Sequence, residues 1–232
     1  MRLTAEQFAC AAAAEASQLR MLRLQSMSHR ELQTLLGGDP AVAAPWVRSA
    51  AEYGLPAAQL RLGRMLLEGR GLARDQSQAL HWFTRAARQG DADAMNMVGR
   101  CHENAWGIPV DLQSAAHWYR LSADRGHDWG QYNFGNMLFD GRGIAIDQPH
   151  AVRWYGRAAA QGHARAMNLL GRCCEEGWGC PKNLAQAFDW YRCSAEAGYF
   201  RAQFNHAAAL AERGFASEAA EWLRRAAAGP QP

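Results

Sequence analysis

The residues whose type and spacing could support metal or thiol chemistry are four cysteines, Cys173, Cys174, Cys180 and Cys193. Thiolates bind zinc, and reactive thiols can carry redox chemistry. Adjacent residues of a helix point about 100° apart, so Cys173 and Cys174 are poorly placed to share one ion. The paired short spacings of zinc fingers are also missing. We expect no metal centre and no cofactor. A metal- or thiol-dependent redox sensor or enzyme that uses the Cys173–Cys193 cluster stays the alternative function.

The sequence lacks the motifs of common hydrolases and nucleotide-binding enzymes. It contains neither a Walker phosphate loop nor an HExxH zinc motif. Its single lysine is Lys182, and Gly179 stands three positions before it, so the Ser-x-x-Lys motif is absent as well. The sequence therefore predicts a protein that is not an enzyme.

These side chains belong to a repeating sequence with a step of 36 residues. The tryptophans that keep this step are Trp46, Trp82, Trp118, Trp154 and Trp190. Two glycine columns keep it too, one typified by Gly63 and one by the loop glycine Gly71. A fixed period of this size indicates stacked structural repeats. The last unit ends near Trp222, 32 residues after Trp190, so we expect its central loop to be four residues shorter.

Each unit is predicted to form two helices. A side-chain oxygen that can cap the second helix stands at one repeat position, which holds Asp75, Asp111, Asp147 and Asn183. The helix ends at a glycine such as Gly90, which suits a left-handed C-cap. The first helix, typified by residues 92–107, contains the Gly63 column. Glycine inside a helix costs about 1 kcal/mol relative to alanine, so this column predicts a close helix crossing.

The combined pattern of small residue, helix glycine, loop glycine, Asp, Trp-Tyr, Ala-Ala and Gly resembles the Sel1-like repeat, a longer relative of the tetratricopeptide repeat. The resemblance covers roughly residues 39–228. It implies an all-α fold, a right-handed superhelical solenoid of antiparallel helix pairs, and a role in holding other proteins together. We expect residues 1–38 to form an N-terminal helical cap and residues 39–232 to form the solenoid.

Composition narrows the class of partner. The formal net charge is +3 and the arginines are interspersed with acids, which argues against nucleic acid. No apolar run approaches the length of a membrane span. The cysteines take apolar repeat positions, as small hydrophobic residues do in a reducing compartment, so we expect a cytoplasmic protein.

The resemblance also implies where a partner binds, because the first helices of tetratricopeptide-like units line the concave side. Asn and Arg one turn apart on successive first helices can hold a peptide's carbonyls or carboxylates, and aromatic side chains can add apolar pockets. The candidate binding residues carried over in this way are Asn96, Arg100, Trp129, Tyr132, Asn136, Asn168, Arg172 and Phe204. Two alternatives stay open: Arg172 and Glu176 can pair with each other, and Tyr132 and Phe204 can pack between units.

The function that these observations favour is a non-enzymatic scaffold or adaptor, which binds a protein or peptide in its concave groove. A self-assembling structural module is a further alternative.

Overall fold

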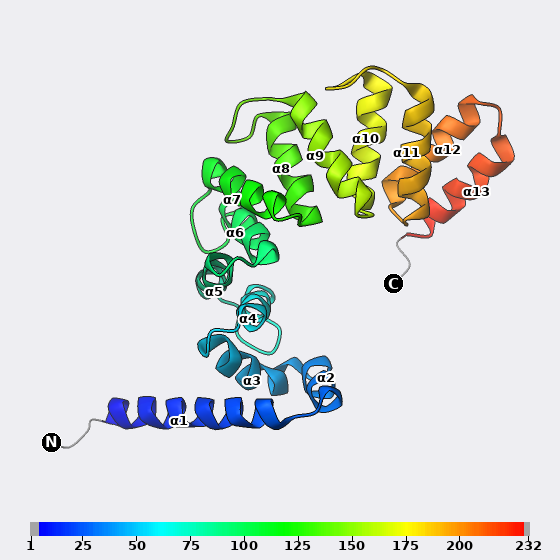
Figure 1. Cartoon of the computed structure of the whole chain (residues 1–232). Helices are drawn as coiled ribbons and strands as arrows, with labels where there is room; N and C mark the ends of the chain where they lie inside the picture. The colour runs from blue at the N-terminus through cyan, green and yellow to red at the C-terminus, as the bar shows by residue number, and fades with distance from the viewer. Residues whose placement is uncertain (1–4, 230–232) are drawn as a thin grey trace. The chain divides into compact units, whose positions relative to one another are not determined.

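The computed structural model describes residues 5–229. The first four residues of the predicted cap and the last three of the predicted solenoid lie outside this range. The described residues form thirteen α-helices and no strand (Figure 1). The helices are α1 (Ala5–Ser26), α2 (His29–Gly37), α3 (Pro40–Glu52), α4 (Pro56–Glu68), α5 (Gln76–Arg88), α6 (Ala92–Asn104), α7 (Leu112–Asp124), α8 (Asp128–Asp140), α9 (Gln148–Ala160), α10 (Ala164–Glu176), α11 (Leu184–Glu196), α12 (Phe200–Glu212) and α13 (Ala216–Ala227).

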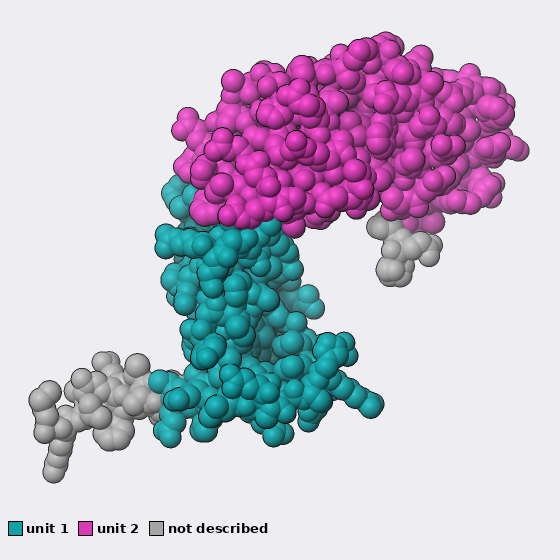
Figure 2. Space-filling model, viewed as in Figure 1, with its two compact units in different colours: residues 1–110 teal, residues 111–232 magenta. Residues whose placement is uncertain are grey.

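The chain divides into two compact units, Met1–Val110 and Asp111–Pro232, which Figure 2 colours separately. We call them unit 1 and unit 2. In unit 1, α3 contacts α4, α4 contacts α5 and α5 contacts α6, and α1 and α2 both contact α3. In unit 2, every helix from α7 to α12 contacts the next one. The predicted all-α solenoid of helix pairs is confirmed. The boundary between cap and solenoid at residues 38 and 39 stays a prediction.

The second helix of each full repeat starts where the capping residues predict. Asp75 accepts a hydrogen bond from the Gln78 amide at 2.9 Å. The same bond recurs at Asp111, Asp147 and Asn183, each at 3.0 Å. The shortened last unit is confirmed too, because α12 and α13 are joined by residues 213–215 alone, whereas residues 177–183 join α10 to α11.

The core of unit 2 is built around aromatic rings of α9 and α11 that lie against glycines of the preceding helix. A Cβ added at Gly135 of α8 would lie 2.6 Å from the Tyr155 ring, and Gly171 of α10 has the same relation to Tyr191. In unit 1, Gly63 of α4 lies against Phe83. The close crossing predicted for this column is thus present, and Tyr155 is 1% exposed beneath it.

A second close approach links each repeat to the one before it. The loop glycine Gly143 has a φ of +73°, and a Cβ there would overlap the carbonyl oxygen of Leu112 at the start of α7. The other loop glycines have the same relation to the start of an earlier helix, in the pairs Gly71 with Pro40, Gly107 with Gln76 and Gly179 with Gln148. We call this contact the loop seat. It is made by backbone, so it fixes the distance between successive repeats without a particular side chain.

Candidate peptide-binding surface

The candidate residues in unit 2 lie on the first helix of each of its helix pairs. Trp129, Tyr132 and Asn136 belong to α8, Asn168 and Arg172 to α10, and Phe204 to α12. We call these six residues the ladder surface. Two neighbouring hollows of about 320 Å³ and 290 Å³ lie along it, and they share Leu169 and Arg172 in their linings.

The first hollow has an aromatic rim. Tyr132 lines it and stacks on His163 at 4.8 Å between ring centroids, while Trp129 meets the same imidazole edge-on at 4.5 Å. The Arg165 guanidinium lies 5.2 Å from the Trp129 ring centroid and 5.9 Å from that of Tyr199. These contacts hold the rim in place, and they leave Trp129 40% exposed.

The charged side chains that line the first hollow are all cationic. The cationic residues that line it are Arg165, Arg172 and Arg201, and no acidic residue is among its described lining. Arginine guanidinium groups bind carboxylates and carbonyl oxygens through parallel N–H donors. Phe204 lies beside them on α12, 43% exposed, so the hollow combines hydrogen-bond donors with an apolar wall.

The second hollow contains Asn136 and an arginine–tryptophan stack. The Tyr155 hydroxyl donates to Asn136 Oδ1 at 2.9 Å, which orients the amide nitrogen of Asn136 as the group able to donate to a ligand. The Arg172 guanidinium lies 5.2 Å from the Trp178 ring centroid. Burial raises the pKa of Tyr155 far above its ordinary value, so its hydroxyl keeps the proton it donates.

Not every candidate is accessible to a ligand. Asn168 is 6% exposed, and its Oδ1 accepts a hydrogen bond from Asn205 Nδ2 at 2.9 Å. In unit 1, Asn96 is 4% exposed, whereas Arg100 is exposed and stacks on Trp106 at 4.9 Å. The structure thus groups six of the eight candidates on the ladder surface of unit 2, and it places Asn96 and Arg100 in unit 1.

Five residues that line the first hollow were not predicted from the sequence: Arg165, Leu169, Tyr199, Arg201 and Asn205. A signal for two of them was present, because Arg165 and Arg201 share the repeat position of Trp129, one turn before the column of Asn168. Tyr199 occupies the repeat position that directly precedes the first helix of a pair. The sequence therefore indicated a helix-capping position there and not a binding residue.

Two of the four clustered cysteines belong to the core, whereas Cys180 and Cys193 are only partly buried. Cys173 and Cys174 are buried, and the Sγ atoms of Cys174 and Cys180 lie 4.0 Å apart. Burial raises the pKa of Cys173 to about 12 and that of Cys174 to about 11, so both thiols are protonated near neutral pH. Among the described residues, no group of three His, Cys, Asp or Glu side chains is arranged to hold a metal ion.

The protonation state of His163 makes the stability of this part of unit 2 depend on pH. Its Nδ1 accepts the Ala166 amide hydrogen at 3.2 Å and caps α10, a bond that protonation of Nδ1 would remove. Burial lowers the pKa of His163 below its ordinary value, and the carboxylate of Asp128 opposes this only in part. The unfolded chain therefore binds the proton more readily than the folded one. The stabilisation from neutral His163 is present above the unfolded-state pKa of about 6.5 and is lost as the pH falls through the folded-state value.

We expect His163→Asn to weaken the acid sensitivity of the fold, because asparagine can cap α10 and does not titrate. The melting temperature of the wild type should fall between about pH 7.5 and pH 5, and that of the variant should fall less. Circular dichroism melts across this range measure the difference. His81→Asn, at an exposed histidine, is the control and should follow the wild type. Equal slopes for wild type and His163→Asn would contradict the expectation.

None of the helices in residues 5–229 combines the length and the apolar character needed to cross a lipid bilayer. A model of the Sel1 repeat matches residues 56–91, 92–127, 130–163, 164–199 and 216–229, which together make up more than half of the chain.

Two solved structures illustrate the similarity. A protective antigen of uropathogenic Escherichia coli strains, described as displaying an SLR fold, is 30% identical with a TM-score of 0.74; the match covers 84% of this chain and 44% of that one. A Sel1 repeat protein from Oxalobacter formigenes is 27% identical with a TM-score of 0.74, over 80% of this chain and 76% of that one. The chain thus spans less than half the length of the Escherichia coli antigen. No curated protein matches the sequence.

Proposed function

The chain belongs to the Sel1 repeat family, and from that premise we propose that it is a non-enzymatic adaptor that binds a protein or peptide segment on the ladder surface of unit 2. The Sel1 repeat fold is typically a scaffold for protein–protein interaction. The observation that carries the proposal is the position of Arg172, whose side chain lines both hollows of that surface.

The proposed partner segment lies extended across the two hollows. Arg172 and the amide nitrogen of Asn136 donate hydrogen bonds to its carbonyl or carboxylate oxygens. Trp129 and Phe204 take up its apolar side chains, because large exposed aromatic rings gain most from being covered. Arg165 and Arg201 add positive charge beside the first hollow, so a segment with acidic side chains near its apolar ones is favoured.

The proposal places the protein in the cytoplasm and gives it no nucleic-acid partner. All five cysteines whose side chains the structure describes are free, as is usual in a reducing compartment. The formal net charge of +3 is small for a protein that binds a phosphate backbone.

A display selection tests the proposed surface. Peptides selected on the immobilised protein from a random library are measured by fluorescence anisotropy against wild type and Arg172→Ala/Phe204→Ala. We expect the double variant to lose at least about tenfold in affinity, because it removes a central donor and an aromatic anchor. The control, Arg153→Ala/Leu184→Ala, removes an exposed arginine and an exposed leucine of α9 and α11, and it should bind as wild type does. Selected peptides that bind both variants equally would refute the ladder surface as the binding site.

A further inference from the structure

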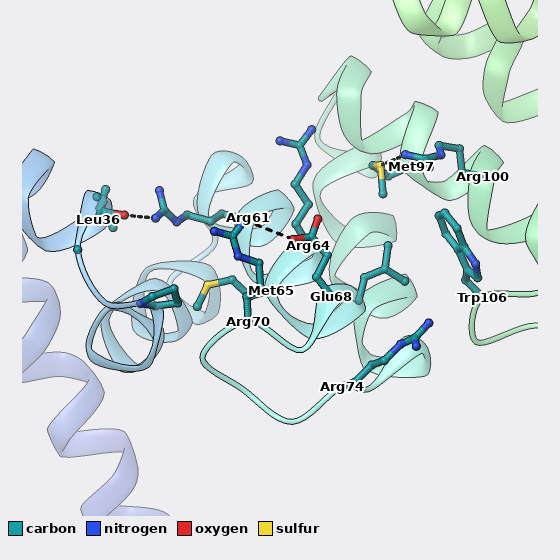
Figure 3. A pocket seen from close by; sticks show the side chains of 14 residues that line it. Leu36, Arg61, Arg64, Met65, Glu68, Arg70, Arg74, Met97, Arg100 and Trp106 are labelled. Atoms are coloured by element: carbon teal, nitrogen blue, oxygen red, sulfur yellow. Dashed lines mark hydrogen bonds and ion pairs between the residues drawn. The ribbon is translucent and has the colours of Figure 1, made fainter. Parts of the chain in front are cut away.

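Unit 1 contains a hollow of about 1020 Å³ of its own, bordered by α2, α4, α6 and the loops after α4 and α6. Five arginines line it: Arg61, Arg64, Arg70, Arg74 and Arg100 (Figure 3). We call it the arginine hollow. We propose that it is a second binding site, separate from the ladder surface, for a peptide segment that combines acidic and apolar side chains.

The charge of the arginine hollow is only partly balanced within the protein. Arg64 pairs with Asp93 at 2.5 Å, and Arg70 lies 3.6 Å from Glu68. The guanidinium of Arg61 donates to the Leu36 carbonyl, and that of Arg100 stacks on Trp106. With these two acids counted against five arginines, an excess of three positive charges borders the hollow. This local excess is as large as the formal net charge of the whole chain, +3.

The repeat supplies an internal comparison, because six of the residues that line the second hollow of unit 2 stand 72 residues after residues that line the arginine hollow. The arginine–tryptophan stack is kept, with Arg172 and Trp178 in place of Arg100 and Trp106. Three of the other four cations are not kept, because Asn133, Asn136 and Ile146 take the positions of Arg61, Arg64 and Arg74. Arg142 keeps the position of Arg70.

The fold therefore builds this hollow without those three arginines. Their presence in unit 1 is not a requirement of repeat stacking. Arg64 is paired with Asp93, so the positive charge that they leave for recognition is that of Arg61 and Arg74. Charge complementarity indicates carboxylates as the ligand groups, since each guanidinium can bind one through two parallel hydrogen bonds.

The rest of the lining decides the kind of ligand. Met65, Leu67, Met97 and Trp106 form an apolar part of the wall, and thioether and tryptophan side chains suit apolar anchors of a peptide. In the view of Figure 3, Trp106 and Arg100 lie at one end of the hollow and Leu36 at the other, with the remaining arginines between them. The space exceeds what one carboxylate or phosphate fills, and Glu68 in the lining disfavours a phosphate backbone. A peptide segment with alternating acidic and apolar residues matches both parts of the wall.

The test uses the full chain and two fluorescein-labelled peptides of about ten residues. One alternates Glu with Leu, and the other has Gln in place of each Glu. Fluorescence anisotropy measures both against wild type, Arg70→Gln/Arg74→Gln and Arg48→Gln/Arg88→Gln. Arg70 and Arg74 are exposed arginines of the hollow, while Arg48 and Arg88 are exposed arginines of unit 1 outside it. Both double variants lose the same charge, so the second controls for net charge.

We expect the Glu peptide to bind wild type at least about tenfold more tightly than the Gln peptide does, and to weaken as NaCl rises from about 50 to 300 mM. The Arg70→Gln/Arg74→Gln variant should lose at least about tenfold, and the control less than about twofold. No binding of the Glu peptide, equal affinity of the two peptides, or equal loss in both variants would overturn the proposal. Binding of a labelled single-stranded RNA in place of the Glu peptide would overturn it too. Because Arg172 and Phe204 are untouched, failure here leaves the ladder surface of unit 2 a separate question.

Discussion

Replacing Gly143 with alanine is expected to destabilise unit 2 by about 3 kcal/mol or more. Two effects add at this position. The φ of +73° costs a residue with a Cβ about 1–2 kcal/mol. The new Cβ also overlaps the Leu112 carbonyl at the start of α7, which cannot rotate away as a side chain would, and such overpacking typically costs a further 1–3 kcal/mol or so. Urea unfolding followed by circular dichroism measures the change.

Gly162→Ala is the matched control for this prediction. Gly162 also has a positive φ, +89°, but no atom lies within 4 Å of where its Cβ would be. We expect the control to cost only the backbone term, about 1–2 kcal/mol. The difference between the two variants then isolates the loop seat. Equal destabilisation by both would show that the loop does not rest on the preceding repeat.

Tyr155→Ala is expected to have an effect of similar size, about 3–5 kcal/mol, because it removes a fully buried ring from the centre of unit 2. The ring lies against Gly135, which has no side chain to move into the cavity. Removing the ring also leaves Asn136 Oδ1 without the hydroxyl that donates to it. Chemical denaturation again measures the loss.

Tyr155→Phe separates the ring from its hydroxyl. Phe83 occupies the equivalent position of an earlier repeat, so the fold accepts phenylalanine there. We expect this variant to lose about 1 kcal/mol, the net contribution of one hydrogen bond. If Tyr155→Phe proved as damaging as Tyr155→Ala, the hydrogen bond rather than the ring would be the main contribution.

Helix positions were predictable because their signals are local. A capping oxygen at Asp75 and a glycine at residue 90 fix the two ends of α5 from neighbouring residues alone. The Gly63 column likewise predicted a close crossing, although it could not say that a ring of the following helix, Phe83, would fill it. The starts of α8 and α10 were harder to predict, because His127 and His163 cap these helices and histidine is not among the usual capping residues.

The binding surface was less predictable. A repeat position indicates which side of its helix a residue occupies, but it does not indicate whether neighbouring side chains bury that residue. Asn96 and Asn168 occupy the same column as Tyr132, but both are buried, and Asn168 is bonded to Asn205 of α12. The loop seat was missed for a related reason. It joins backbone to backbone and leaves only a glycine in the sequence, which a tight turn would explain equally well.

The loop seat also restricts how such a chain can change its length. Each seated glycine lies 31 residues beyond the carbonyl that it touches, as Gly143 does beyond Leu112. An insertion or deletion between two such partners changes this spacing and separates them, whereas duplication or loss of an entire 36-residue unit restores every seat. The shortened link 213–215 agrees with this, because no atom lies within 4 Å of where a Cβ of its Gly214 would be, so this glycine makes no seat. Internal repeats are therefore expected to be gained or lost whole during evolution.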